Sequence, residues 1–175
     1  MTASPSPQNR LRVAHLNPRA PTPFALQPDE ATRAAIAQEL ELSDLPKLEF
    51  TGEIRAEGGD AWHLTGQLKA RVVQPCVVTL KPVKTSLNET VERHYSPHVV
   101  VPEGEEIEML DDSIEPLGQF IDLAAVMVEE LSLALPEYPR ADGAELGQDA
   151  IEDDSRDTRR PFEGLNQLMQ GRKDD

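Results

Sequence analysis

Apolar and polar residues alternate most regularly between residues 48 and 72, and this pattern predicts β-strands. Every second residue over 48–54 is apolar or glycine, and the Glu-Gly-Gly-Asp stretch at 57–60 is typical of a hairpin turn. From Trp62 to Val72 the alternation is nearly perfect, with polar residues on the intervening positions. We therefore expect two antiparallel strands, each with one buried and one wet face.

Later residues extend this sheet. After Gln74-Pro75, the β-branched stretch 76–80 is expected to continue the strand, and 85–95 is expected to form another. The residues predicted to face inward on that last strand are Leu87, Val91 and Tyr95. Consecutive strands joined by short turns favour an antiparallel β-meander or partial barrel.

Two main helices are expected to pack on the sheet, which makes the fold class α+β. The first begins near Pro28-Asp29-Glu30, where a proline and acids suit a first turn, and continues to Leu42. The second lies within QFIDLAAVMVEELSLALPEYP, residues 119–139. Its residues 120–135 are apolar in most directions around the axis, so we expect it to be buried on both flanks with Leu131 in the core.

The composition predicts one folded domain with tails. Residues 1–17, rich in Ser, Pro and Gln, are interpreted as a flexible N-terminal tail. A single α+β domain is expected over 18–140, including an acidic loop at 102–118. We expect 141–158 to be an acidic disordered linker and 159–175 to be a C-terminal tail with a short docking segment.

Charge is distributed unevenly along the chain. The net charge is −15, from 32 acidic and 17 basic residues, and the stretch 101–154 holds 17 acids with Arg140 as its one base. Such a stretch repels phosphate and suits either a basic protein partner or simple solubility.

The cysteine count and the hydropathy of the chain bear on its cellular compartment and on whether it is secreted or inserted in a membrane. With one cysteine the chain has no internal disulfide framework and no all-cysteine zinc site, which favours a reducing compartment. The N-terminus does not have the pattern of a secretory signal, and no apolar run approaches the roughly 18 residues of a membrane span. We expect a cytoplasmic protein without a membrane partner or a cofactor; the oligomeric state is not predicted.

Candidate catalytic and metal residues each have a simpler structural interpretation. Asp122 and Glu129 share one helical face, but simpler roles explain them better than acid/base catalysis: Asp122 caps the helix, and Glu129 pairs with a basic side chain or a backbone donor. No nucleophile, phosphate loop or ligand cluster accompanies them, so the sequence does not predict an enzyme. His63, His94 and His98 are interpreted as surface histidines, and no metal-binding residue is predicted.

Basic residues on the strands form the remaining candidate surface for RNA or a partner. If the sheet places these side chains on one face, they would contact RNA phosphates. However, a mixture of Lys, Arg, Thr and Gln is found on the solvent-exposed face of any sheet. No aromatic residue that could stack on a base lies among them. The candidates are Lys69, Arg71, Lys81, Lys84 and Arg93.

Three stretches in order carry a resemblance to a known family: QPCVVTLKPV, FIDLAAVMVEELSLALPEYP and RPFEGLNQL. Together they resemble the YceD family of bacterial proteins, over roughly residues 24–169. The resemblance implies a non-enzymatic role in the processing, assembly or accumulation of 23S ribosomal RNA, with that RNA or a basic ribosomal protein as partner. An acidic adaptor for basic proteins, without an RNA role, is the alternative. The positions that match the family's motifs are Cys76, Asp122, Glu129 and Pro136.

One departure from the family bears on metal binding. Many members carry a Cys-x-x-Cys and further cysteines after the Leu-Pro turn, which suggests a metal clip. Here Thr79 stands three residues after Cys76, and no cysteine follows Pro136. Since a structural zinc site normally takes four protein ligands, we expect the fold to need no metal and Cys76 to be a small buried residue.

Overall fold

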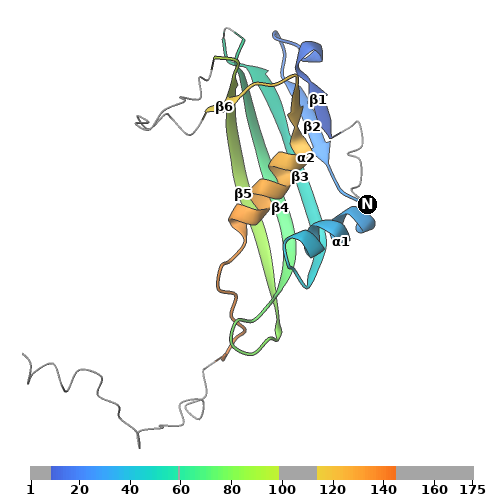
Figure 1. Cartoon of the computed structure of the whole chain (residues 1–175), viewed down its shortest axis with the longest axis vertical. Coiled ribbons are helices and arrows are strands. Elements are labelled where there is room, and N and C mark those ends of the chain that lie inside the picture. The colour runs from blue at the N-terminus through green and yellow to red at the C-terminus, as the bar shows by residue number, and fades with distance from the viewer. Residues whose placement is uncertain (1–8, 59, 99–113, 145–175) are drawn as a thin grey trace, which may run out of the picture. The chain divides into compact units, whose positions relative to one another are not determined.

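The computed structural model of the chain describes residues 9–58, 60–98 and 114–144 (Figure 1). In chain order the elements are β1 (Arg10–Arg12), a 3-10 turn (Val13–His15), β2 (Thr22–Leu26), α1 (Glu30–Glu39), β3 (Asp44–Ala56), β4 (Trp62–Pro75), β5 (Pro82–Ser96), β6 (Ile114–Pro116), β7 (Phe120–Asp122) and α2 (Leu123–Ala134).

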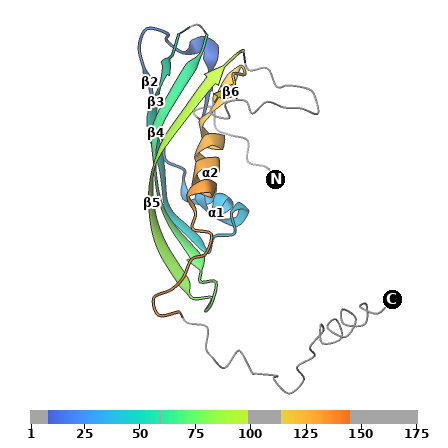
Figure 2. The same ribbon diagram turned by 90° about the vertical axis from the view of Figure 1, so that its left-hand side faces the viewer.

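The main sheet has five strands in the order β2-β3-β4-β5-β6. The first four form the predicted antiparallel meander, whereas β6 joins β5 in parallel. The sheet is curved and open, and both helices lie on its concave side (Figure 2). The α+β fold class, with a sheet packed by two helices, is therefore confirmed.

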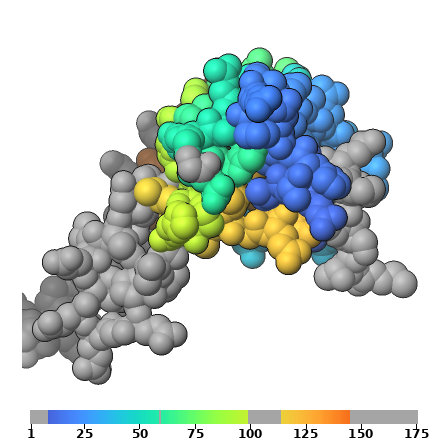
Figure 3. Space-filling model, turned by 90° about the horizontal axis from the view of Figure 1, so that it is seen from above, coloured from blue at the N-terminus to red at the C-terminus, as the bar shows by residue number. Residues whose placement is uncertain are grey.

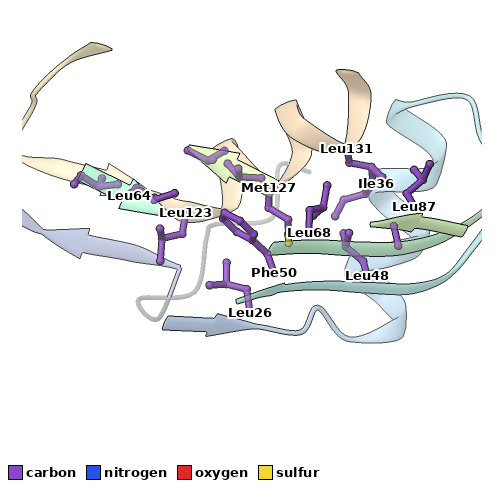
Figure 4. Packing of buried hydrophobic residues seen from close by; sticks show 14 of the residues in the cluster. Leu26, Ile36, Leu48, Phe50, Leu64, Leu68, Leu87, Leu123, Met127 and Leu131 are labelled. Atoms are coloured by element: carbon purple, nitrogen blue, oxygen red, sulfur yellow. The ribbon is translucent and has the colours of Figure 1, made fainter. Parts of the chain in front are cut away.

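The core lies between the sheet and the helices, and the alternation along β4 explains it. Every second residue from Trp62 to Val72 faces the helices, and the large apolar ones among them are buried. From the other side, α2 contributes Leu123, Met127 and Leu131 to the same cluster (Figure 4). Leu131 is fully buried, as the sequence predicts.

Two glycines on neighbouring strands make room for aromatic rings. Gly52 and Gly66 are directly paired, and a Cβ on Gly66 would lie 2.6 Å from Phe50 Cε2. The rings of Phe24 and Phe50 lie 5.0 Å apart at a tilt of 56°, so they pack against each other beside the glycine pair. Glycine is required here because the core aromatics approach the backbone closely.

Both helices begin at the aspartates that the sequence indicates. Asp29 Oδ1 accepts the Thr32 N–H at 2.9 Å, and Asp122 Oδ1 accepts the Ala125 N–H at 3.1 Å. The first helix ends at Glu39, three residues before the predicted end. Glu41 adopts a positive φ of 54°, a left-handed conformation that does not continue a helix.

The prediction for the second helix was wrong in two respects. Residues 120–122 form strand β7, so the helix does not begin at residue 120 but at Leu123, directly after the predicted Asp122 cap. It is also buried on one side instead of both, since Leu133 is 72% exposed while Leu131 is buried. Apolar residues on the outer side of a helix are common on protein surfaces and do not by themselves indicate a second packing partner.

The N-terminal boundary also differs from the prediction. Arg10–Arg12 pairs antiparallel with Phe120–Asp122, and Leu16 is buried. Residues from 9 onward therefore belong to the folded unit and not to a flexible tail. Figure 3 shows the blue N-terminal strands beside the yellow segment that holds β6 and β7. The compact unit ends at Asp142, close to the expected end at residue 140.

The stretch after β4 is a turn and not a continued strand. Residues 76–80 carry no strand, and the Leu80 N–H donates to the Cys76 carbonyl at 2.9 Å. Leu80 has a positive φ of 59°, which turns the chain back into β5. Predictions for 1–8, the larger part of the acidic loop, the linker from 145 and the C-terminal tail lie outside the described residues. Among the helices described, none is long and apolar enough to cross a membrane.

Candidate functional site

Four cations gather on the face of the sheet opposite the helices, here called the outer face. In the strand register Lys47 is paired with Arg71, and the next row along β4 places Lys69 between Glu49 and Asn88. Lys84 is paired with Val73, one row beyond Arg71. Directly paired residues of antiparallel strands project from the same face, so these side chains lie together. We call the set Lys47, Lys69, Arg71 and Lys84 the basic patch; all four are exposed.

The basic patch contains three of the five cations that the sequence nominates. Lys81 lies in the turn before β5, where its carbonyl accepts the Cys76 N–H at 2.8 Å, and so it is outside the sheet face. The sequence does not indicate Lys47 as part of this surface, because its position beside Arg71 depends on the register of β3 against β4. The same register runs unbroken from the Ala56–Trp62 pair at the hairpin to Lys47–Arg71, and a β-bulge shifts it only beyond Lys47, at Asp44.

Two carboxylates lie near the basic patch and reduce its charge. Glu49 Oε2 is 3.1 Å from Lys47 Nζ, and Glu49 is directly paired with Lys69. The hydrogen bond from Lys47, followed by its charge, holds the pKa of Glu49 below its usual value. Asp44 is paired with Val73 at the end of the sheet. Four cations and two acids leave a local charge of about +2, within a chain of net charge −15.

Arg93 lies on the opposite face from the basic patch, against the predicted grouping. It is paired with Leu64, whose side chain faces the helices. Its Nε and Nη2 donate to Glu130 Oε1 at 2.9 and 2.6 Å, and its Nη1 donates to Glu115 Oε1 at 2.5 Å. Glu129 Oε1 lies 3.5 Å from Arg93 Nη2, so of the two partners predicted for Glu129, a basic side chain or a backbone donor, the structure shows the first. Arg93 therefore joins β5 to α2 and β6.

These contacts also affect the titration of half-buried Arg93 and buried Tyr95. Burial alone would lower the pKa of Arg93, but hydrogen bonds to Glu130 and Glu115 outweigh it and raise the pKa. Burial raises the pKa of neighbouring Tyr95, and the charge of Glu115 adds to this effect. Both groups therefore keep one protonation state across the physiological range.

Cys76 is fully buried, as predicted, but its sulfur is surrounded by hydrogen-bond donors. The sulfur accepts N–H groups from Val78, Thr79 and Ala141 at 3.5, 3.4 and 3.3 Å. Hydrogen bonds from the Thr79 side chain and from the Ala141 N–H lower the pKa of the thiol to about 6. Because Ala141 follows α2, its hydrogen bond to the Cys76 sulfur connects the 76–81 turn to the segment after that helix.

The other family-motif positions have structural partners. Asp122 caps α2 and forms an ion pair with Arg10, whose Nε lies 3.2 Å from Asp122 Oδ2. The Pro136 carbonyl accepts a hydrogen bond from Gln74 Nε2 at 3.2 Å. Since Asp122 and Glu129 bind different arginines, each performs the structural role that the sequence favours.

Two histidines that the sequence treats as separate surface residues are brought together on the outer face. His63 of β4 and His94 of β5 are directly paired, and their rings stack with centroids 4.2 Å apart. Glu57 and Glu92 lie within hydrogen-bond distance of these rings. This cluster lies at the other end of β4 from the basic patch.

A family model described as "Large ribosomal RNA subunit accumulation protein YceD" matches residues 64–169, which is more than half of the chain. The chain belongs to the YceD family. The match begins within β4, later than the start near residue 24 that the sequence resemblance suggests. Searches of curated proteins and of solved structures gave no match. The family's description supports a role related to ribosome biogenesis.

Proposed function

We propose that this YceD-family protein is a non-enzymatic factor that supports accumulation of 23S ribosomal RNA by contacting RNA through the basic patch. The observation that carries the proposal is the strand register, which places Lys47, Lys69 and Arg71 in adjacent rows of one exposed face. The family's link to large-subunit ribosomal RNA supplies the partner.

The pairing of Lys47 with Arg71 supports a binding role. Like charges directly opposite each other on neighbouring strands destabilise a sheet, so folding alone does not favour this pair. Departures from local structural rules are expected where a site serves binding. Two cations in adjacent strands offer phosphate oxygens a pair of positively charged donors.

The negative net charge is compatible with RNA contact at this patch. At physiological ionic strength the Debye length is about 8 Å, so exposed acids far from the patch are largely screened from a phosphate bound there. The acids would still weaken binding at low salt through long-range repulsion. The proposal therefore predicts weak and reversible RNA binding.

The side chains on the outer face favour contact with the RNA backbone over base recognition. Trp62 and Tyr95 face the core and are buried, so neither is placed to stack on a base. Phosphate contacts position a protein without reading sequence, and paired RNA is recognised mainly by shape and backbone. We expect structured RNA to bind at least as well as unpaired RNA of the same length.

The test is a salt titration of RNA binding with a matched pair of variants. Fluorescence anisotropy would measure the affinity of the full chain for a structured 23S fragment, with Lys69→Glu/Arg71→Glu as the patch variant. Arg12→Glu/Arg19→Glu makes the same charge change at exposed residues outside the patch. Each phosphate contact adds roughly −0.7 to −0.9 to the slope of log K against log salt concentration. If the patch variant loses two phosphate contacts, its slope should be less steep by roughly 1.4 to 1.8.

The control pair separates local contact from net charge. It should lower affinity modestly and leave the salt slope nearly unchanged. An equal loss of RNA affinity and salt slope in both variants would show that only net charge matters and that the basic patch does not contact RNA. The alternative is an acidic adaptor that binds basic proteins through the 17 acids of residues 101–154. It would be favoured if the wild-type protein did not bind RNA at low salt but still retained basic ribosomal proteins after nuclease treatment.

A further inference from the structure

The paired histidines on the outer face form a compact cluster with two carboxylates. His63 and His94 project from the central β4–β5 pair, and their rings are parallel within 9°. Glu57, at the turn after β3, places its Oε2 2.7 Å from His94 Nδ1. Glu92, two residues before His94, places its Oε1 2.8 Å from His63 Nε2 and 3.8 Å from His94 Nε2.

We propose that Glu57, His63 and His94 bind a first-row divalent cation of the Zn²⁺ type. Two imidazoles and a carboxylate form a donor set that zinc prefers, and three protein ligands leave a further position for water. One potential ligand atom from each residue lies within 4.8 Å of the other two. Ligands about 2.0–2.2 Å from a tetrahedral ion are roughly 3.4 Å apart. Because imidazole binds a metal in the plane of its ring, one of the two stacked rings must turn out of the stack before both face a common ion. The 2.7 Å contact between Glu57 and His94 must also open by about 0.7 Å.

The backbone already holds the two imidazole ligands in place. β4 and β5 pair over 14 consecutive positions from Trp62–Tyr95 to Pro75–Pro82, so the Cα atoms of both histidines are fixed before any ion arrives. The histidine side chains are 23% and 31% exposed, whereas those of Glu57 and Glu92 are 44% and 61% exposed. The imidazoles are thus half-buried on a rigid surface, while the carboxylates can adjust from solvent.

Glu92 acts as a positioning residue in this arrangement. Its carboxylate accepts a hydrogen bond from one His63 ring nitrogen, which leaves the other ring nitrogen to bind the ion. Carboxylates that hydrogen-bond a ligating histidine fix the ring and increase its basicity. Replacing such a partner typically lowers metal affinity by roughly 10–100-fold, so Glu92→Gln should weaken binding without abolishing it.

Calorimetric titration of the full chain with zinc chloride tests the proposal. The wild-type protein should bind one Zn²⁺ in a step that His63→Gln and His94→Gln each remove and that Glu57→Gln weakens. His15→Gln is the matched control, because His15 lies in the 3-10 turn outside the cluster. Cys76→Ser is a second control, since a thiol also binds zinc, and this variant should retain the step.

A Co²⁺ titration keeps the test decisive if a histidine variant fails to fold. The wild-type protein should give a visible d–d spectrum without thiolate-to-metal charge-transfer absorption, as nitrogen and oxygen ligands require. Absence of zinc binding by the wild type would overturn the proposal. The proposal would also be overturned if zinc binding persisted in both folded histidine variants. Loss of zinc binding in Cys76→Ser, together with a thiolate band in the cobalt spectrum, would likewise overturn it.

Discussion

Replacing Arg93 with methionine should destabilise the fold strongly, although the sequence alone groups this residue with an exposed RNA-binding stripe. The guanidinium group joins β5 to α2 and β6 through Glu130 and Glu115. Its side chain is 17% exposed, and that of Glu130 is 18% exposed. Methionine keeps the apolar stem but leaves these carboxylates without their cation.

The magnitude follows from the burial of each partner. Removing one member of a buried ion pair costs about 3–5 kcal/mol, and a hydrogen bond between charged groups contributes about 1.5–3 kcal/mol. Glu115 is 32% exposed and Glu129 is 57% exposed, so solvent screens their share and the upper values do not apply. We expect a loss of about 2–4 kcal/mol at neutral pH, which corresponds to a melting temperature lower by about 6–15 °C.

Urea and thermal unfolding followed by circular dichroism would measure this loss. Arg93→Lys keeps the charge but not the forked geometry, so it should lose about half as much. A double-mutant cycle with Glu130→Gln should give a coupling energy above about 1 kcal/mol. A melting temperature of Arg93→Met within about 1 °C of wild type would show that Arg93 does not hold β5 to α2 and β6, and that its guanidinium is solvated and free to contact RNA.

Three further outcomes test the fold and the thiol. Leu131→Ala should cost about 2–5 kcal/mol in urea unfolding, because the side chain is fully buried; a loss below about 1 kcal/mol would contradict its place in the core. Gly52→Ala should cost about 1–3 kcal/mol because the new Cβ would overlap the Thr65 carbonyl, whereas Gly118→Ala, with its nearest atom 3.9 Å away, should change little; equal effects would count against the close packing. The absorbance of the Cys76 thiolate should titrate near pH 6, and a midpoint near pH 8.5 would contradict the hydrogen bonds to its sulfur. Since folding lowers this pKa, the stabilisation is fully present above about pH 8.5 and is lost as the pH falls through 6, a trend that Cys76→Ser should remove.

The alternation of residues predicts the core better than it predicts the site. Along β4 a period of two places Trp62, Leu64 and Leu68 on one face whatever the neighbouring strands do, so the buried residues follow from sequence. The helix starts at Asp29 and Asp122 are also local, because an N-cap depends on residues two or three positions away.

The site depends on register, which the sequence pattern did not define. If residues 76–80 are taken as strand, the β4–β5 turn has no defined position, and the pairing of His63 with His94 is then undefined. The face of Arg93 is a local property of β5 and does not depend on the turn. Applying the period of two from Leu87 to Arg93 would have placed this arginine inward. The β1–β7 pair joins three-residue segments more than 100 residues apart, a contact that no local pattern signals.

Recovery of 23S precursor RNA from cells, compared between the wild-type protein and the patch variant, would show whether the basic patch contacts RNA. The tagged wild-type protein and Lys69→Glu/Arg71→Glu would be pulled down from lysate at low salt, with and without nuclease, and the precursor of 23S RNA quantified. We expect the wild type to recover this RNA in a nuclease-sensitive manner. The folded patch variant should recover much less, while Arg12→Glu/Arg19→Glu should resemble the wild type. Equal recovery by the wild-type protein and the patch variant would contradict RNA contact through the outer face.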